Sequence, residues 1–305
     1  MTSLVTDASA PPAGLEPLTV PPRRWPAVLG AVLTVAMVAG LVWELFDTGL
    51  AGLTQSVPTD PRFYLFFAMF FMALPVGDYL IFRRLWGIPI AGLAALTKKR
   101  IANDLIVNYT GEAYFYSWAR ERAKFVTAPF GAIKDVSILS AIAGNAVTLL
   151  MVLIALPLGR NLLTADQFQT GLWSTAALIA LSAPFLIFSR RVFSLPRRSL
   201  WEVFGMQSAR VIASSTFTAL AWAHALPDVS VAMWLFLAAG RLLVSRLPLL
   251  PNKELVFFTF ANFVIGEQET LTQLLAFFAA LTLATNGVLI ILFGLHGLIT
   301  RRKFP

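Results

Sequence analysis

The chain has 305 residues, of which 57% are hydrophobic and only 13% are charged, whereas an ordinary soluble domain carries roughly 25% charged residues. This composition excludes a soluble domain and predicts an integral membrane protein. The chain contains no cysteine, which excludes disulfides, thiolate metal sites and iron–sulfur clusters, and its net charge of +8 is better explained by cytoplasmic loops and anionic lipid headgroups than by nucleic acid.

In chain order, residues 1–22 come first. They are rich in Ala, Pro and Thr and lack aromatic residues, which predicts a disordered cytoplasmic tail. Residues 23–303 are predicted to form a single transmembrane domain, because no polar segment between apolar stretches is long enough for a soluble core. The predicted fold is an all-α polytopic bundle of about eight spans, most of them near the ~20 residues that cross hydrocarbon. The predicted spans are residues 26–46, 63–82, 136–158, 171–189, 205–226, 230–247, a short segment at 254–266, and 270–298.

The distribution of Lys and Arg predicts the orientation. If both termini are cytoplasmic, only Arg62 and Arg160 of the 24 Lys and Arg residues fall in predicted external loops. Positive charges are retained on the cytoplasmic side, so this orientation places a multi-pass protein in a bacterial-type inner membrane. The basic clusters that then lie inside are residues 83–84, 98–100, 120–134, 190–198 and 301–303.

Residues 86–132 interrupt the pattern of spans, because this region is too polar for a simple crossing and too aromatic for a plain loop. Gly87, Pro89 and Gly92 break helices, and Thr110 is a good N-cap for a new helix in TGEAYFYSWA. We therefore predict a re-entrant helical hairpin. Non-helical backbone is tolerated at membrane depth only where protein or a wet cavity satisfies it. The helix start near Thr110 is thus expected to mark a cavity, with its positive dipole end facing an anion.

A second interruption, LPLLPNKE, has the same features. Pro248 and Pro251 end one helix, and Glu254 stands in the first turn of the next. Two short, broken segments at corresponding positions of two halves are typical of transporters with a midplane site between repeats. The matching segments TGEAYFY and NKELVFF are short, so internal duplication stays open at this level.

Three stretches carry a resemblance to a known family: DYLIFRRLWG, beginning at Asp78, NYTGEAYFYSWARERA, and RLLVSRLPLLPNKELVFFTFANFVIGE. Over roughly residues 25–300 their order and spacing resemble the flippase-like membrane domain of lysylphosphatidylglycerol synthases and their free-standing relatives. The chain departs from the family pattern at two places. Tyr109-Thr110 stands where the family has Pro-Gly, and Pro251-Asn252-Lys253 stands where the family has a glycine-rich turn. Lys134-Asp135 matches a further charged motif of the family only in part.

The resemblance implies two inverted halves, each with a re-entrant hairpin, that enclose a cavity for a lipid headgroup. The implied activity is moving or holding a phospholipid or another lipid between leaflets without ATP. Membrane lipids with an anionic or lipid-linked headgroup are the expected partners, and a second copy of the chain or a lipid-synthesising enzyme is a further candidate. No cofactor and no nucleic acid are expected.

The candidate substrate-binding residues lie at these breaks or within spans: Glu112, Glu254, Arg241, Asp78, Gly111, Tyr114 and Lys253. A charge at mid-bilayer costs about 2.5–3.5 kcal/mol on insertion scales, so such residues face a partner or a cavity. Arg241 is predicted to bind lipid phosphate or to pair with a hairpin glutamate. Glu112 and Glu254 either serve the headgroup or only complement the dipole of the helix they begin. The sharpest expectation is that Glu112, Glu254 and Arg241 line one shared cavity.

Other polar and aromatic residues are assigned to the bilayer rather than to a site. Arg210 and Arg246 are expected to extend toward the cytoplasmic face. The two histidines of the chain, His224 and His296, are expected to be packing or interface residues. Interface anchoring is also expected of Tyr116 and Trp118, and it is the alternative to ligand contact for Tyr114.

Two other functions fit the sequence. One is a membrane-embedded transferase that uses a lipid-linked donor, with Glu44, Asp47 or Asp60 as an external base or metal ligand. The other is a non-transporting scaffold subunit of a membrane assembly. The sequence contains no P-loop, nucleophile elbow, metalloprotease or dinucleotide motif, so no catalytic or metal-binding residue is assigned.

Overall fold

The computed structural model describes residues 57–105, 110–122, 130–159, 193–246 and 269–302, together with a few isolated positions. Within these ranges the chain forms seven helices and no strand, which confirms the predicted all-α fold class. The predicted tail at residues 1–22 and the predicted spans 26–46, 171–189 and 254–266 lie outside the described residues, apart from those isolated positions.

Three described helices contain stretches that are long and apolar enough to cross a membrane: Pro61–Trp86, Phe130–Ala155 and Gln273–Leu295. They belong to α3 (Pro61–Trp86), α6 (Phe130–Gly159) and α12 (Glu269–Arg302), and they match the predicted spans 63–82, 136–158 and 270–298. The chain is therefore a multi-pass membrane protein.

Two further predicted spans are helical but differ from a plain crossing. α9 (Arg197–Ala225) has 29 residues, yet buried polar side chains such as Gln207 and Ser215 make it less apolar than α3, α6 and α12. α10 (Val231–Ser245) has 15 residues, fewer than the ~20 that a crossing needs. The predicted span 230–247 is thus a shorter apolar helix.

The interrupted region of residues 86–132 contains two short helices, α4 (Ala91–Leu105) and α5 (Thr110–Arg122). α3 ends at Gly87, which adopts a left-handed conformation (φ 64°) and donates its N–H to the carbonyl of Arg83; glycine adopts this conformation at little cost. α5 begins at Thr110, where a helix start is predicted, and Thr110 is its first helical residue. The two helices have 15 and 13 residues, so neither is long enough for a full crossing.

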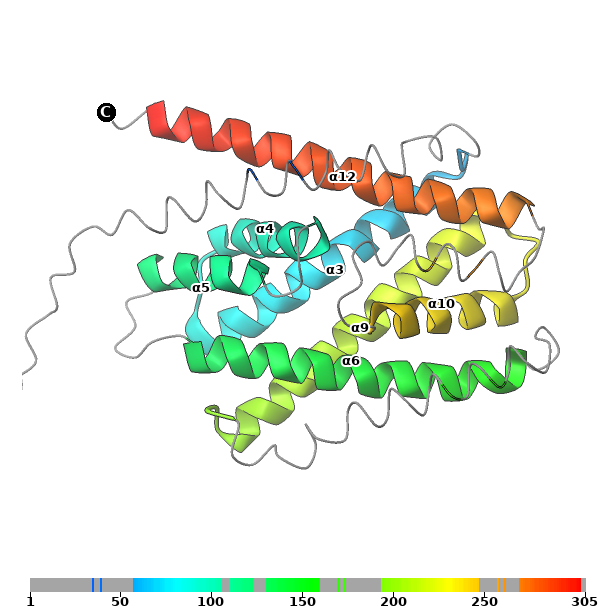
Figure 1. Ribbon diagram of the computed structural model, residues 1–305, viewed down its shortest axis with the longest axis horizontal. Helices are drawn as coiled ribbons and strands as arrows, with labels where there is room; N and C mark the ends of the chain where they lie inside the picture. Colours follow the sequence, from blue (N-terminus) through cyan, green and yellow to red (C-terminus); the bar gives the residue numbers. More distant parts are fainter. Residues whose placement is uncertain are drawn as a thin grey trace, which may run out of the picture.

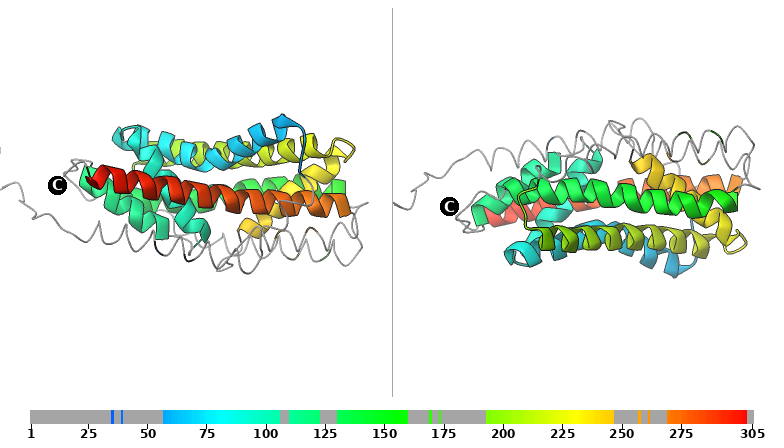
Figure 2. Two further views of the ribbon diagram at one scale, coloured as in Figure 1. Left: turned by 90° about the horizontal axis from the view of Figure 1, so that it is seen from above. Right: turned by 90° about the horizontal axis from the view of Figure 1, so that it is seen from below.

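The helices form two layers (Figures 1 and 2). α3 and α9 lie side by side in one layer, and α6 and α12 run along the other. The short helices fill the space between α6 and α12, with α4 and α5 at one end of the molecule and α10 toward the opposite end. In chain order the described elements repeat a long–short–long pattern, first as α3, α4/α5 and α6, then as α9, α10 and α12.

α3 and α9 are antiparallel. Three polar contacts link them, and the residue numbers rise along α3 while they fall along α9. The contacts are Asp60–His224 (3.2 Å), Asp78–Arg210 (2.7 Å) and Arg84–Glu202 (2.8 Å). His224 also stacks on Phe66 with the ring planes only 10° apart, in agreement with its predicted packing role.

Two buried aromatic clusters hold the layers together. The first joins α3, α9, α10 and α12 through Phe63, Phe67, Phe70, Phe71, Trp222, Trp234 and Phe278. The second joins α3, α4, α5 and α6 through Tyr79, Phe82, Leu96, Phe115, Trp118 and Ile133. Asp78 lies on α3 between these two groups of residues. The apolar cores therefore flank a single charged position of the helix.

The aromatic residues of α5 are core residues more than interface anchors. Phe115 stacks with Trp86 and with Trp118, and Trp118 is buried, which corrects the expected interface role of that tryptophan. Tyr116 is half-buried and meets the ring of Phe130 edge-on. Phe115 and Trp118 are three residues apart on α5, so their side chains share one face of that helix.

Candidate functional site

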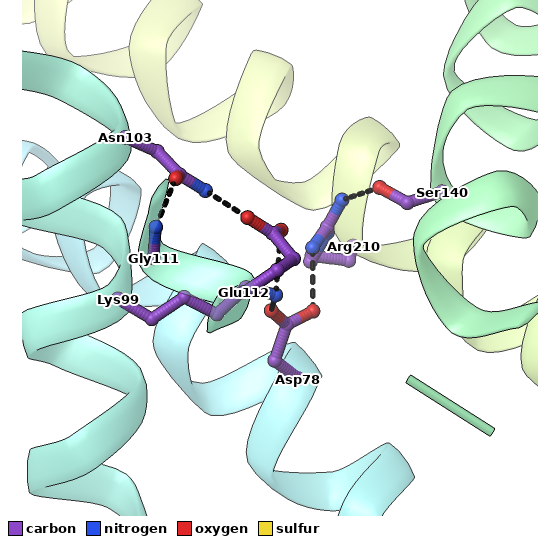
Figure 3. A network of polar contacts seen from close by, with 7 residues as sticks. All are labelled: Asp78, Lys99, Asn103, Gly111, Glu112, Ser140 and Arg210. Atoms are coloured by element: carbon purple, nitrogen blue, oxygen red, sulfur yellow. Dashed lines mark hydrogen bonds and ion pairs between the residues drawn. The ribbon is translucent and has the colours of Figure 1, made fainter. Parts of the chain in front are cut away.

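Asp78 is the centre of a buried polar network (Figure 3). One carboxylate oxygen accepts a hydrogen bond from Lys99 of α4 at 2.8 Å, and the other accepts one from Arg210 of α9 at 2.7 Å. A buried carboxylate is tolerated only when it is paired and hydrogen-bonded. Each of its two oxygens therefore has a cationic partner from a different helix.

Lys99 is shared between two carboxylates. Its amino group lies 3.3 Å from an oxygen of Glu112, in the first turn of α5. Asn103 completes the link, because its amide nitrogen donates to Glu112 at 3.0 Å while its amide oxygen accepts the backbone N–H of Gly111 at 2.8 Å. Glu112 thus complements the start of α5, and it is also an ion-pair partner inside the protein.

Gly111 and Gly77 provide the room for these ion pairs. A Cβ atom at Gly111 would overlap the backbone carbonyl of Lys99, so α5 packs directly against the main chain of α4. A Cβ atom at Gly77 would overlap the aliphatic stem of Arg210, which crosses α3 there. Both glycines are required for close approach rather than for an unusual backbone conformation.

Arg210 also donates to the hydroxyl of Ser140 on α6 at 2.9 Å. This geometry corrects the expectation that Arg210 extends to the cytoplasmic face, because its guanidinium is held in the interior by Asp78 and Ser140. Asp78, Lys99, Asn103, Gly111, Glu112, Ser140 and Arg210 are called the Asp78 network below. The Asp78 network connects five helices: α3, α4, α5, α6 and α9.

The charges of the Asp78 network balance, with two carboxylates and two cations. The members differ in access, since the side chain of Glu112 is 18% exposed and that of Asp78 only 2%. Glu112 also makes the longer contact with Lys99. An anionic group that enters the network would therefore reach Lys99 most easily by replacing the carboxylate of Glu112.

Arg100, the residue after Lys99, repairs a break in α3. Pro75 lies inside α3 and has no N–H, so the carbonyl of Phe71, four residues earlier, loses its helical donor. The guanidinium of Arg100 donates to that carbonyl and contacts Asp104 at 3.3 Å. Side chains commonly satisfy such freed backbone groups in membrane helices.

The other predicted site residues are placed as follows. Arg241 lies over the rings of Phe70 and Phe278, at 4.6 and 5.9 Å from their centres, in the first aromatic cluster rather than in the Asp78 network. Tyr114 is half-buried against the apolar side chains of Ile101 and Ile290. Glu254 and Lys253 lie outside the described residues, so the shared cavity of Glu112, Glu254 and Arg241 stays a prediction.

The site contains residues that sequence reasoning did not select. The sequence places Lys99 and Arg100 in a cytoplasmic basic cluster, but both are buried. Lys99 pairs with Asp78 in the interior, and Arg100 donates to the carbonyl of Phe71. Asn103 and Ser140 were also missed. The available signals were the intramembrane Asp78, which requires a cation, and Pro75, which requires a donor for Phe71.

Of the residues considered for a transferase or a metal site, one has structural contacts in the described part of the chain and the others lie outside it. Asp60 accepts the N–H of Arg62 at the start of α3 and contacts His224. Glu44 and Asp47 lie outside the described residues, as does the side chain of His296. In the described part of the chain, no three His, Asp or Glu side chains gather into a metal-binding cluster.

Comparisons with known protein families, with curated proteins and with solved structures gave no significant match.

Proposed function

We propose that the protein is a lipid-handling transporter of the inner membrane, a flippase or lipid-binding relative that accepts the headgroup of a phospholipid or lipid-linked compound at the Asp78 network. The observation that supports this proposal is that four charged side chains from α3, α4, α5 and α9 meet at one place in a membrane protein, where Asp78 and Lys99 are buried and Glu112 and Arg210 are partly buried. Both termini are proposed to be cytoplasmic, and membrane lipids are the proposed partners.

The energetic cost of placing these charges in a membrane favours a functional role for them. Each charge in the hydrocarbon region costs about 2.5–3.5 kcal/mol on insertion scales, and intramembrane ionisable residues usually mark a substrate or ion pathway. Buried ion pairs are weak evidence for stability, because apolar side chains of similar volume often stabilise a fold as well or better. Four charges that gather without a clear gain in stability are therefore better explained by binding.

The arrangement of the helices supports the same proposal. α3 is antiparallel to α9, and the short helices α4/α5 and α10 lie toward opposite ends of the bundle between α6 and α12 (Figure 1). Inverted halves with re-entrant hairpins would produce this order, and transporters of that type bind substrate where broken helices meet. The start of α5, capped by Asn103 beside Lys99, is such a place.

The proposal is tested by reconstitution. Purified protein in phospholipid vesicles should accelerate the movement of a headgroup-labelled lipid between leaflets, measured as the fraction of label accessible to an external quencher. Lys99→Met removes the cation shared by Asp78 and Glu112 and should reduce that movement by more than it reduces the yield of folded protein. Wild-type protein that leaves the label distribution of empty vesicles unchanged would refute a transport function.

A non-transporting scaffold subunit is the second candidate. The observation that favours it is that the two carboxylates and two cations of the Asp78 network balance each other without any ligand. On that account Lys99→Met would reduce folding and any activity in parallel. The transferase alternative has less support, since Asp60 already caps α3 and pairs with His224.

A further inference from the structure

Gln207 of α9 is a buried polar residue beside the Asp78 network. Its side chain has 0% exposure, and its amide is close enough to the carboxylate of Asp78 to act on it electrostatically. Within the described part of the chain, however, neither the amide nitrogen nor the amide oxygen of Gln207 has a hydrogen-bond partner. The residue thus adjoins the network without being bonded to it.

The register of α3 and α9 places Gln207 next to the centre of the network. Arg210 and Glu202, the α9 residues on either side of it, pair with Asp78 and Arg84 of α3. Gln207 precedes Arg210 by three residues, which is about 4.5 Å along the helix axis, and residues three apart are neighbours on a helix surface. A second donor from α9 to Asp78 would come from this position.

An unpaired amide at this depth is unfavourable. A buried donor or acceptor without a partner has lost its hydration and gained nothing in return, and buried polar side chains are nearly always paired in folded proteins. An apolar side chain of similar volume would avoid this loss. We therefore expect Gln207 to have a partner in another state of the protein.

We propose that Gln207 is a positioning residue, which replaces Lys99 as a hydrogen-bond donor to Asp78 when Lys99 turns to an anionic lipid headgroup. This inference rests on the proposed function and names what the Asp78 network does when its ligand binds.

The two cations of Asp78 differ in how firmly they are held. Arg210 also donates to Ser140 at 2.9 Å, and its aliphatic stem packs against Gly77, so groups on α6 and α3 fix its position. Lys99 contacts two carboxylates, one of them at the longer distance of 3.3 Å, and its ammonium group stands on a flexible four-carbon stem. Lys99 is therefore the cation that an entering anion can draw away from Asp78.

Departure of Lys99 leaves one oxygen of Asp78 without a donor. The two carboxylate oxygens accept hydrogen bonds from Lys99 and Arg210 separately, and a buried carboxylate that loses a partner is strongly disfavoured. Gln207 can supply the missing donor, because its amide nitrogen is unpaired within the described residues and lies near the same carboxylate. The hydrogen bond that Gln207 gains offsets part of the loss and makes ligand entry easier.

The first experiment tests this exchange of donors without any lipid. The midpoint of thermal unfolding in neutral detergent micelles is measured for Gln207→Met in two backgrounds, the wild type and the double variant Lys99→Met/Glu112→Gln. The double variant removes one cation and one anion, so Asp78 keeps Arg210 and loses only its second cation. The difference between the two backgrounds measures the coupling of Gln207 to Lys99.

Opposite effects are expected in the two backgrounds. In the wild type, Gln207→Met should leave the midpoint unchanged or raise it, because the substitution removes an unpaired amide. In Lys99→Met/Glu112→Gln, the same substitution should lower the midpoint by a few degrees, because it removes the donor on which Asp78 then depends. Equal effects in both backgrounds, or a lower midpoint in the wild type, would overturn the exchange.

The second experiment measures lipid binding. Spin-labelled phosphatidylglycerol is titrated against the full chain in the same micelles, for the wild type, Gln207→Met and Thr218→Val. Thr218 is the matched control, because it is another buried polar residue of α9 and its hydroxyl bonds to the carbonyl of Ser214 in its own helix. Gln207→Met should weaken binding by about tenfold, as expected when a hydrogen bond to a charged group is lost, and Thr218→Val should bind as the wild type does.

The outcomes separate this inference from the proposed function. If the wild type binds the lipid and Gln207→Met binds it equally well, the role of Gln207 is overturned and the transport proposal stands. If the wild type binds no labelled lipid, the proposed headgroup binding is refuted, and the comparison of the two backgrounds decides whether Gln207 replaces Lys99. Displacement of bound lipid by millimolar inorganic phosphate would assign the anion to free phosphate and overturn the lipid headgroup as its source.

Discussion

α3 and α9 are joined by two arginine–carboxylate pairs of nearly the same length and very different surroundings. Asp78–Arg210 spans 2.7 Å in the interior, with side-chain exposures of 2% and 10%, whereas Arg84–Glu202 spans 2.8 Å near the end of α3 with exposures of 61% and 34%. The interatomic distance therefore says little about the energy of either pair. Burial and additional partners determine what each pair does.

The buried pair requires further groups and the exposed pair does not. Asp78 takes a second cation from Lys99, and Arg210 takes a hydroxyl from Ser140; without them the desolvation of two charges would exceed their mutual attraction. Water solvates Arg84 and Glu202, so that pair contributes little. The same contact geometry is thus part of a buried network in one place and a surface contact in the other.

The largest expected effect comes from removing the centre of the buried pair. Asp78→Asn leaves Lys99 and Arg210 buried with only Glu112 to compensate them, and breaking a buried pair in this way costs about 3–5 kcal/mol. The free energy of unfolding in micelles should fall accordingly. An unfolding curve that coincides with the wild type would show that Asp78 is not a central counterion.

A double substitution sharpens this result. Asp78→Leu combined with Arg210→Leu leaves Lys99 paired with Glu112, so the remaining charges balance again. Most of the stability lost in Asp78→Asn should return, because well-packed apolar residues often replace buried ion pairs without loss. A double variant less stable than Asp78→Asn would mean that packing, rather than charge balance, controls this region.

A smaller loss is expected at the close approach of α5 to α4. Gly111→Ala places a methyl group against the carbonyl of Lys99, and overpacking of this kind typically costs about 1–3 kcal/mol. Gly205→Ala is the matched control, since no heavy atom lies near a Cβ at Gly205 of α9, and alanine there should stabilise the helix by about 0.5–1 kcal/mol. Equal effects of the two substitutions would contradict the direct contact of the two backbones.

The smallest effect is expected at the exposed pair. Glu202→Gln should leave thermal unfolding indistinguishable from the wild type. The hydrogen bond from Arg84 lowers the pKa of Glu202 below its ordinary value, so any contribution of this pair is present at neutral pH and is lost as the pH falls through that lowered pKa. A clear destabilisation by Glu202→Gln at neutral pH would remove the contrast between the two pairs.

Local features of the sequence predicted the elements but not their partners. The apolar stretches of α3, α6 and α12 and the Gly and Pro breaks around α4 and α5 are local signals, and Asp78, Gly111 and Glu112 were selected from them. Lys99 and Arg210 pair with Asp78 across 21 and 132 residues, and no local pattern specifies such distances. Lys99 was assigned to a cytoplasmic basic cluster because adjacent basic residues usually lie at the membrane surface, whereas here a buried carboxylate determines its position.

Lipid movement in Glu112→Gln, compared directly with Glu202→Gln, tests the central claim most directly. Both substitutions neutralise one glutamate that pairs with a cation, but Glu112 contacts Lys99 in the Asp78 network and Glu202 contacts Arg84 at the surface. In vesicles with equal amounts of folded protein, the account predicts that Glu112→Gln slows the movement of labelled lipid by about tenfold and that Glu202→Gln moves it at the wild-type rate. Equal rates for the two folded variants would contradict the claim that the Asp78 network handles the headgroup.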